Sequence, residues 1–280
     1  MDKRFGVMAF GTALILLAVS CHSLPGRKAP DEPLAILAAF EQEATRLEAM
    51  LADAEAREIE GLRFVAGTLG GRPVVVGKSG VGKANAAMAT TLLIEHFRPD
   101  RVLLTGIAGG VDPNLTPGDI VVAERTAHHD MGILWPEGIE PGGVRDPVTG
   151  SDNPTFFPAD EALLAAARRA AARVTLDAVE LKAGRRAPRV VFGTIVTGDA
   201  FIASEAKCAE LLDTMDARAV EMEGAAVAQI CYQWGIGCLV VRSIADKADE
   251  SAVLDKQKFY ELAGVNSVRL VVEIVRCLGQ

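Results

Sequence analysis

Aromatic residues and basic charge are both scarce in this chain of 280 residues. Only 5% of the residues are aromatic, and 29 Lys and Arg stand against 37 Asp and Glu, which gives a net charge of −8. Proteins that bind nucleic acid hold its phosphates with clustered Lys and Arg, and no basic stretch alternates with aromatic residues here. We therefore expect no nucleic-acid partner.

Metal-ligand patterns are also missing. The four histidines form no His-x-x-x-His pair, and the five cysteines form no Cys-x-x-Cys pair. We therefore expect no metal site and no cofactor. We interpret Cys208, Cys231, Cys238 and Cys277 as small core residues. A disulfide among them cannot be assigned from their spacing.

No apolar run is long enough to cross a membrane comfortably. The longest, Phe5 to Val19, follows Lys3 and Arg4 and covers about 15 residues. A basic start, a short apolar core and small residues before Cys21 are typical of a secretory signal. The sequence therefore predicts a signal peptide over residues 1–20.

Cys21 stands where bacterial lipoproteins carry their lipid, although Ala18 replaces the usual Leu of that motif. We predict cleavage before Cys21, lipidation of this cysteine, and a proline-containing tether over residues 21–33. The protein would then be periplasmic or on the cell surface, in contact with the membrane only through its lipid anchor. Plain secretion, with Cys21 incidental, is the alternative.

Residues 34–280 show strand patterns that alternate with helical patterns. Half of the chain is hydrophobic, which is ample for one well-buried domain. Strands are predicted at 34–39, 62–69, 73–78, 101–105, 119–127, 189–197, 217–220 and 237–244. Helices are predicted at 41–54, 82–97, 160–174, 204–215, 223–234 and 256–278. This order predicts an α/β fold with a mixed sheet between helical layers.

Gly77 to Ala84 nearly match a phosphate-binding P-loop between a strand and a helix. Ala84 stands where Ser or Thr would hold magnesium. We therefore interpret the segment as a glycine turn that begins a helix, and we reject hydrolysis of nucleoside triphosphates.

Carboxylates follow two late strands, at Glu221 and Glu223 and at Asp246, and Glu43 lies near the start of the domain. Ligands of open α/β sheets bind at such strand ends. Each acid also has an ordinary interpretation. Glu43 alone would be a solvated charge on a helix, Asp246 could cap a helix, and spacing does not distinguish Glu221 from Glu223.

Seven motifs together resemble the 5′-methylthioadenosine/S-adenosylhomocysteine nucleosidases of the purine nucleoside phosphorylase superfamily. They cover residues 39–45, 78–83, 105–110, 118–122, 197–202, 220–226 and 241–249. The resemblance extends from about Leu34 to Leu278 and implies a three-layer nucleoside phosphorylase-like fold. It implies hydrolysis of adenine-type nucleosides to free base and free sugar. We also expect a homodimer.

The resemblance assigns the chemistry to two acids. Glu43 matches the general base that activates water, and Asp246 matches the acid that protonates the purine at N7. The glycosidic bond breaks through a cation-like sugar, so the reaction needs a protonated leaving group, a poised nucleophile and nearby negative charge. One acid must be protonated while the other is ionised, which their surroundings must enforce.

The resemblance also implies a binding site for the nucleoside. Glu223 matches the carboxylate that holds the ribose hydroxyls, and Met222 packs under the sugar. Phe201 stacks on the purine, and the backbone of Ile202 reads its edge. Ile107 belongs to the same site but replaces the usual Ser.

Three further features depart from the family. Ala245 replaces a Ser that can orient Asp246, so rate or base preference is expected to differ. The segment from Gly132 to Pro158 is long and is predicted to alter the pocket for the 5′-substituent. Salvage of methylthioadenosine is an intracellular task, which makes the signal peptide unexpected.

Two rival functions remain open. A phosphorylase would need polar or basic groups for phosphate, whereas Leu104 and Ile107 predict an apolar wall there. A non-catalytic nucleoside-binding lipoprotein would not need both Glu43 and Asp246.

Overall fold

The computed structural model describes residues 32–136, 138–181, 184–248 and 252–278. The predicted signal peptide, almost all of the tether, and Cys21 lie outside these residues. The strands are β1 (Leu34–Ala38), β2 (Ala52–Ile59), β3 (Leu62–Leu69), β4 (Arg72–Lys78), β5 (Arg101–Gly110), β6 (Ile120–His128), β7 (Gly132–Trp135), β8 (Gly138–Pro141), β9 (Phe156–Pro158), β10 (Val179–Leu181), β11 (Gly184–Arg186), β12 (Val190–Thr197), β13 (Ala217–Glu221) and β14 (Gly237–Asp246). The helices are α1 (Glu41–Glu48), α2 (Lys83–Phe97), α3 (Glu161–Ala171), α4 (Glu205–Met215), α5 (Gly224–Gln233) and α6 (Ala252–Leu278).

One large mixed sheet runs through the molecule in the order β2, β3, β4, β1, β5, β14, β6, β12, β13. β1 lies parallel to β4 and β5, and β14 lies parallel to β5 but antiparallel to β6. All five residues of β1 are apolar and buried, which suits a central strand covered on both faces. The carboxyl ends of β1, β5 and β14 therefore meet at one edge.

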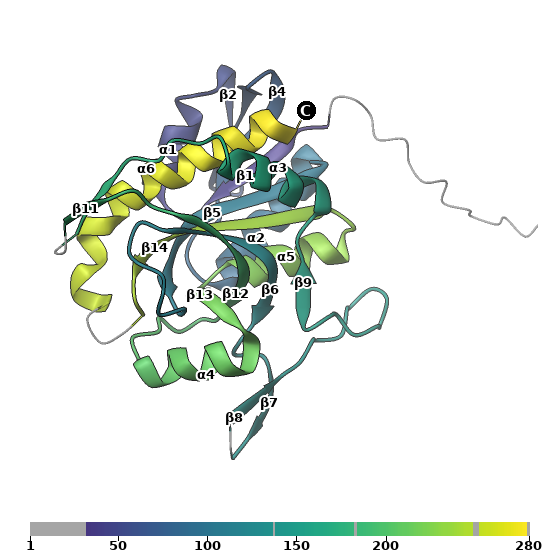
Figure 1. Ribbon diagram of the computed structural model, residues 1–280. Helices are drawn as coiled ribbons and strands as arrows, with labels where there is room; N and C mark the ends of the chain where they lie inside the picture. The colour runs from purple at the N-terminus through teal and green to yellow at the C-terminus, as the bar shows by residue number, and fades with distance from the viewer. Residues whose placement is uncertain (1–31, 137, 182–183, 249–251, 279–280) are drawn as a thin grey trace, which may run out of the picture.

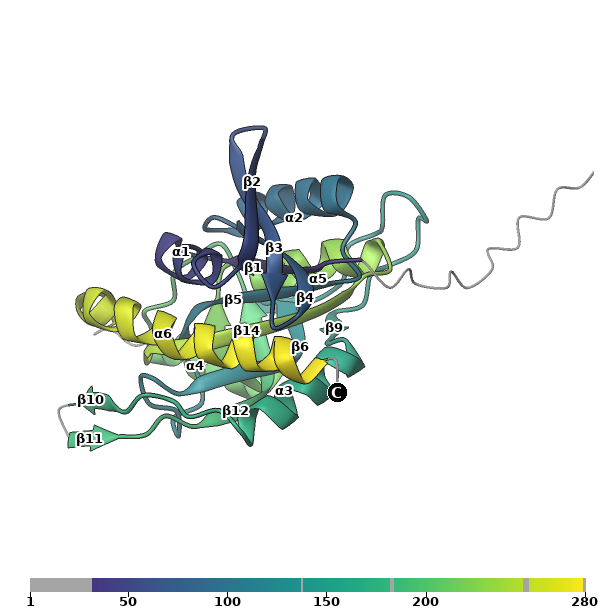
Figure 2. The ribbon, with the colours of Figure 1, turned by 90° about the horizontal axis from the view of Figure 1, so that it is seen from above.

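Helices cover both faces of this sheet (Figures 1 and 2). α2 and α5 pack on one face through residues such as Leu93 and Val227. α1, α3 and α6 pack on the other through residues such as Leu47, Leu163 and Val271. The layers confirm the predicted α/β fold with a mixed sheet between helices. In the described part of the chain, no helix is long and apolar enough to cross a membrane.

The sheet closes on itself at one end, which the sequence did not predict. β13 pairs in parallel with β12 and also antiparallel with β5, where Ala219 faces Gly110 and Val220 faces Gly109. The glycine-rich segment predicted as a loop after residue 105 is therefore the second half of strand β5. This closure places Glu221, at the end of β13, beside the glycines of β5.

Several predicted boundaries were wrong. The helix predicted over 41–54 ends at Glu48, and the strand β2 follows at Ala52. Seven of the eight residues of β2 are exposed, so this strand has no apolar alternation that a sequence pattern could detect. The hairpin β10–β11 was also missed. The segment from 132 to 158 contains the hairpin β7–β8 and strand β9, which pairs with β6.

Candidate active site

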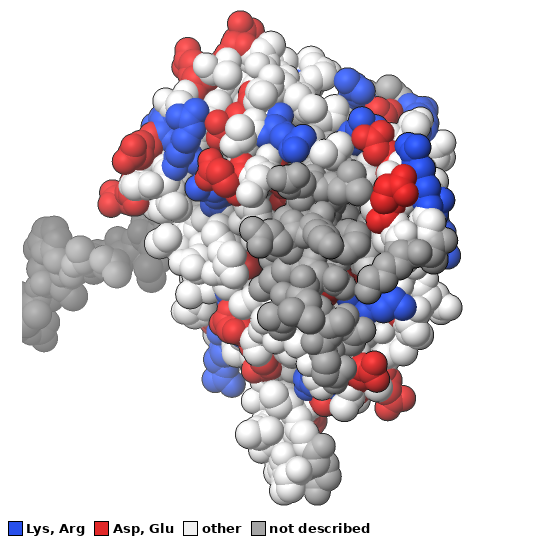
Figure 3. All heavy atoms as spheres, turned by 90° about the vertical axis from the view of Figure 1, so that its left-hand side faces the viewer, with Lys and Arg blue, Asp and Glu red and all other residues white. Residues whose placement is uncertain are grey.

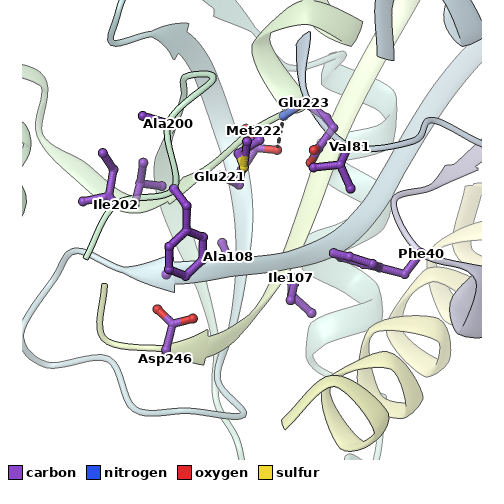
Figure 4. Close-up of a pocket in the computed structure, with 13 residues that line it drawn as sticks. Phe40, Val81, Ile107, Ala108, Ala200, Ile202, Glu221, Met222, Glu223 and Asp246 are labelled. Atoms are coloured by element: carbon purple, nitrogen blue, oxygen red, sulfur yellow. Dashed lines mark hydrogen bonds between the residues drawn. The ribbon is translucent and has the colours of Figure 1, made fainter. Parts of the chain in front are cut away.

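A cavity opens at the carboxyl edge of the sheet, where β5, β13 and β14 end. Its volume is about 130 Å³. It is lined by Phe40, Val81, Ile107, Ala108, Gly109, Ala200, Phe201, Ile202, Val220, Glu221, Met222, Glu223 and Asp246. Figure 4 shows Asp246 on one side of the cavity, with Met222 and Glu223 on the other. The site thus combines apolar walls with three carboxylates.

Glu221 and Glu223 differ in how many hydrogen bonds their carboxylates already accept. Glu221 accepts hydrogen bonds from the backbone N–H groups of Glu223 (3.0 Å) and Gly224 (2.8 Å), from the Thr197 hydroxyl and from Arg242. Glu223 accepts fewer, from the Gly82 N–H at 2.8 Å, from Arg242 at 3.2 Å and from the backbone of Met222. Glu221 is therefore committed to the protein, and Glu223 retains acceptor capacity toward the cavity.

Arg242 lies between the carboxylates of Glu221 and Glu223, pairs with both, and is fully buried. Its guanidinium rests on the backbone of Gly106, and a methyl group at position 106 would clash with its Nη1 atom. Its Nε and Nη1 atoms have no hydrogen-bond partner among the described residues. Gly106 therefore belongs to the glycine-rich motif because it makes room for a buried arginine.

Glu43 projects from α1 toward β5 and α6 and is 2% exposed, unlike its exposed neighbour Glu41. The hydroxyl of Thr105 donates to its Oε1 at 3.4 Å and also contacts the hydroxyl of Ser267. Burial raises the pKa of Glu43 to about 7, against the opposing charge of Arg242. Its Oε2 atom has no partner among the described residues. The interpretation of Glu43 as a solvated helix charge is wrong.

Asp246 ends β14 and is 5% exposed. Its Oδ1 atom accepts from the backbone N–H of Ala248 at 2.8 Å. A side chain at Gly109 would meet this Oδ1 atom at 3.0 Å, so the second glycine of the motif gives Asp246 its space. Ala245 offers no hydroxyl, and a backbone N–H fixes the carboxyl group instead.

The P-loop-like turn between β4 and α2 is already occupied by carboxylates of the protein. The Gly82 N–H donates to Glu223, and the Lys83 N–H donates to Asp199 at 2.8 Å. Gly82 has φ +89°, a conformation that favours glycine. A helix N-terminus stabilises negative charge, and here the charge comes from two side chains. This agrees with the rejection of a nucleotide phosphate at the turn.

The structure brings six of the seven predicted catalytic and binding residues to the cavity. They are Ile107, Phe201, Ile202, Met222, Glu223 and Asp246. Glu43 does not line the cavity, and its carboxyl group lies beside Thr105 of β5 and Ser267 of α6.

Two predictions about the cavity wall need correction. Leu104 is fully buried in the core that α2 and α5 cover, so it does not form part of the predicted apolar wall, whereas Ile107 does. No described residue of the segment from 132 to 158 lines this cavity, so in a single chain that segment does not shape the pocket.

The sequence analysis did not single out Phe40, Val81 and Ala200, which also line the cavity. Each neighbours a motif already singled out: Phe40 lies within the 39–45 motif, and Val81 within the glycine turn. Their apolar side chains carried no chemical pattern. Only the assembled cavity identifies them.

Cys208, Cys231, Cys238 and Cys277 are buried and free, which confirms their interpretation as core residues. In the described ranges no group of three or more His, Cys, Asp or Glu is arranged to hold a metal ion.

The model of the phosphorylase superfamily matches residues 33–276. The chain belongs to this superfamily. It is 38% identical over 251 residues to the 5′-methylthioadenosine/S-adenosylhomocysteine nucleosidase of Geobacillus kaustophilus, a match that covers 88% of this chain and 97% of the relative. Identity and coverage of this extent place it in that nucleosidase family.

Solved structures agree with this placement. The nucleosidase of Colwellia psychrerythraea in complex with adenine is 36% identical, with a TM-score of 0.76, over 89% of this chain and 96% of that one. The futalosine hydrolase of Helicobacter pylori is 29% identical, with a TM-score of 0.73, over 87% and 97%. The nucleoside phosphorylase-like fold predicted from the motifs is confirmed.

Proposed function

We propose that this member of the nucleosidase family hydrolyses the N-glycosidic bond of adenine-type nucleosides, with 5′-methylthioadenosine and S-adenosylhomocysteine as the substrate class. The observation that carries the proposal is a cavity with Asp246 on one side and Glu223 on the other, together with the buried carboxyl of Glu43 beside Thr105 of β5. The products are free adenine and free sugar. The relatives named above support this reading.

Asp246 is the proposed acid. The Ala248 N–H fixes one of its oxygens, so the carboxyl group holds one orientation at the edge of the cavity where Phe201 and Ile202 also lie. A purine stacked on Phe201 would receive the proton of Asp246 at N7. Adenine then leaves as a neutral base, which lowers the barrier to breaking the bond.

Glu43 and Arg242 are the proposed pair that handles the attacking water. The Oε2 atom of Glu43 is an acceptor and the Nη1 atom of Arg242 is a donor, and each is buried without a partner among the described residues. A water held by both would donate to Glu43 and accept from Arg242. Glu43 takes its proton as the water attacks the anomeric carbon, while Glu223 holds the ribose hydroxyls and adds negative charge beside the cation-like sugar.

Water is favoured over phosphate by the charge of the site. Among the described residues, no Lys or Arg lines the cavity, whereas Glu221, Glu223 and Asp246 do. The buried Arg242 is already paired with Glu221 and Glu223. A phosphate dianion would meet carboxylates with no free cation to neutralise it, so hydrolysis is the reaction that this site supports.

The test offers the purified mature chain a panel of nucleosides with and without phosphate. Methylthioadenosine, S-adenosylhomocysteine, adenosine, inosine and futalosine are incubated, and base and sugar are identified by chromatography. We expect adenine and a free sugar at a rate that added phosphate does not change. A phosphate-dependent sugar 1-phosphate would refute hydrolysis. Adenine binding without turnover of any nucleoside would favour the binding lipoprotein.

We also propose that the enzyme is exported and anchored by lipid on Cys21. The basic start, the apolar run and the small residues before Cys21 support this. Lipoprotein anchoring uses several acyl chains, as stable membrane attachment requires. The native protein should fractionate with membranes, and Cys21→Ser should release it or block its processing. Cytosolic protein that retains Met1 would contradict export, and soluble exported protein that begins at Cys21 would contradict only the lipid.

A homodimer is the proposed assembly. The hairpin β7–β8 extends from the body of the molecule (Figure 1) and exposes Ile133, Leu134 and Trp135, with Leu134 at 77%. Exposed apolar patches of this kind mark protein interfaces. Around the grey residues, the face shown in Figure 3 mixes basic and acidic side chains.

A further inference from the structure

The segment from Gly198 to Ser204 joins β12 to α4 without regular secondary structure and carries three residues of the cavity wall, Ala200, Phe201 and Ile202. Its two ends are fixed by backbone hydrogen bonds. The Gly198 N–H donates to the Glu221 carbonyl at 3.1 Å, and the Ser204 N–H donates to the Ala248 carbonyl at 2.8 Å. We call residues 198–204 the base segment, because Phe201 is the proposed stacking partner of the purine.

A third attachment links the base segment to α2. The Oδ1 atom of Asp199 accepts the Lys83 N–H, the first of α2, at 2.8 Å. The N-cap residue of α2 is Gly82, which has no side chain to cap the helix, so Asp199 supplies the cap from a segment more than a hundred residues away. The neighbouring N–H of Gly82 holds Glu223 at 2.8 Å. The adjacent N–H groups of Gly82 and Lys83, at the N-terminus of α2, therefore bind Glu223 on one side of the substrate site and the base segment on the other.

Lys83 and Asp130 complete this attachment. The Lys83 Nζ atom donates to Asp130 Oδ1 at 2.6 Å, and the Asp199 N–H donates to Asp130 Oδ2 at 2.9 Å. Burial opposes ionisation of Asp130, but these hydrogen bonds hold its pKa below the usual range. Lys83 and Asp130 are 19% and 28% exposed. We call Lys83, Asp130 and Asp199 the Asp199 cluster, and it fixes both the side chain and the backbone of Asp199.

We propose that the N-terminus of α2 is a shared anchor that sets the spacing between the base segment and Glu223, and that Asp199 is the positioning residue that attaches the base segment to it. The inference rests on the proposed function, because it assigns the purine to the base segment and the ribose to Glu223. Glu43 and Asp246 lie on α1 and β14. Loosening the anchor therefore affects base and nucleoside binding more than it affects the chemical step.

The decisive variant is Asp199→Ala, measured with methylthioadenosine as substrate and adenine as competitive inhibitor. Loss of a side-chain cap at a helix N-terminus corresponds to a factor of about five to ten in an equilibrium constant. We expect KM and the adenine Ki to rise together by about that factor, with kcat changed by less than about twofold. Asp199→Asn retains the acceptor oxygen and should restore both constants to near the wild-type values.

Asp160→Ala is the matched control. Asp160 caps α3 by accepting the Leu163 N–H at 2.9 Å, and it lies at the opposite end of β14 from Asp246, where its N–H donates to the Cys238 carbonyl. Its loss should lower thermal stability without moving KM or Ki. Should Asp199→Ala fail to fold, Asp130→Ala removes the acceptor of both Lys83 and the Asp199 N–H, and the same rise in both constants is expected.

Two results would overturn the inference. One is an Asp199→Ala or Asp130→Ala enzyme whose KM and Ki equal those of Asp160→Ala. The other is an Asn variant as weak as the Ala variant, because the hydrogen bond would then not be what positions the segment. Failure of the proposed function is distinguishable, since the wild-type chain would then release no free sugar from any nucleoside.

Discussion

The acids of this site are distinguished by what surrounds each of them. Glu43 is buried with one oxygen that has no partner among the described residues, Glu221 accepts many hydrogen bonds, and Glu223 keeps capacity toward the cavity. Burial also raises the pKa of Glu223 to about 7, against the charge of Arg242. Three carboxyl groups thus gather around one guanidinium. Their different hydrogen bonding distinguishes the proposed general base, a structural acceptor and the proposed ribose ligand.

Removal of either catalytic acid should abolish most turnover and leave the fold intact. General acid–base groups typically contribute about 10²–10⁴-fold to the rate, so Asp246→Asn and Glu43→Gln should each lower kcat by that range. Glu223→Gln should also raise KM through the lost ribose contacts. Steady-state kinetics and circular dichroism measure both. Near-normal turnover of Asp246→Asn would contradict its role as the acid.

The Thr105 hydroxyl should set where activity falls off at low pH. Activity needs ionised Glu43, so kcat/KM should rise as pH increases through about 7. The hydrogen bonds from Ser267 and Thr105 lower the pKa of Glu43. Thr105→Val should therefore move this limb to higher pH and cost roughly three- to tenfold in kcat/KM at pH 6, with little loss at pH 9, since one pKa unit is tenfold in the ionised fraction.

Arg242 and Glu223 also face Glu43 electrostatically, and they are unchanged in this variant. The control is Thr90→Val, because Thr90 is equally buried and donates to the Ala86 carbonyl within α2 at 2.7 Å. If the acid limb of the kcat/KM profile moved equally in Thr105→Val and Thr90→Val, the cause would be a general packing effect and not the hydrogen bond to Glu43.

Ionised Glu43, the form that the proposed mechanism needs, should lower the stability of the folded protein. Its pKa rises from 4.5 unfolded to about 7 folded, so the folded state binds the proton more tightly. Stability contributed by protonated Glu43 is complete below about pH 4.5 and is lost as pH rises through about 7, at a cost on the order of 3 kcal/mol. Glu43→Gln should therefore melt at a higher temperature than wild type at pH 8 and at a similar temperature at pH 4.5. Equal midpoints at pH 8 would contradict this.

At the scale of elements, β5 and its glycines hold the site together. Gly106 admits the Arg242 guanidinium, and Gly109 admits Asp246 and Ala248. β13 pairs with β5 at this point, so the strand that ends in Glu221 is fixed to the strand that supports Arg242. Glycine serves here for close approach, since neither Gly106 nor Gly109 has a positive φ.

Gly106→Ala should therefore be severe. The added methyl group would clash with Arg242 and also approach the Ala39 Cβ atom at 2.9 Å, and overpacking of a core typically costs about 1–3 kcal/mol. We expect a lower midpoint in thermal unfolding and a loss of turnover, because Arg242 must move away from Glu221 and Glu223. Gly142→Ala serves as the control, because a methyl group there would meet only the Gly132 Cα atom at 3.9 Å and Gly142 has no positive φ. An active, stable Gly106→Ala enzyme would contradict this packing.

Elements with a clear apolar period were predictable from the sequence, whereas those without one were not. β1 and α2 carry runs of buried apolar residues, and they lie where expected to within one residue. β2 is almost entirely exposed and offers no period. Among the site residues, the resemblance to the nucleosidases selected Glu223 and Asp246, whereas spacing alone did not distinguish Glu221 from Glu223. Contacts between distant segments determine the burial of Glu43, the number of hydrogen bonds that Glu221 accepts and the position of Leu104 in the core. No local sequence pattern reports such contacts.

At the scale of the whole molecule, the exposed hairpin β7–β8 is the feature that one chain does not account for. If it is a dimer contact, Leu134→Glu should shift the molar mass measured by light scattering from dimer toward monomer at micromolar concentration. Val148→Glu is the matched control, since Val148 is 91% exposed in the same segment but outside the hairpin. A wild-type monomer would contradict the proposed assembly.

The turn that begins α2 shows that a sequence pattern can indicate an anion-binding turn without identifying the anion that occupies it. Backbone N–H groups at a helix end do not distinguish the oxygens of a phosphate from those of a side chain. Here both places are taken by resident anions, Glu223 and Asp199, each encoded more than a hundred residues downstream. When a G-x-x-x-x-G-K pattern lacks the following Ser or Thr, acids near later strand ends are therefore candidates to bind the turn. Their carboxylate oxygens would take the place of the phosphate oxygens of a nucleotide.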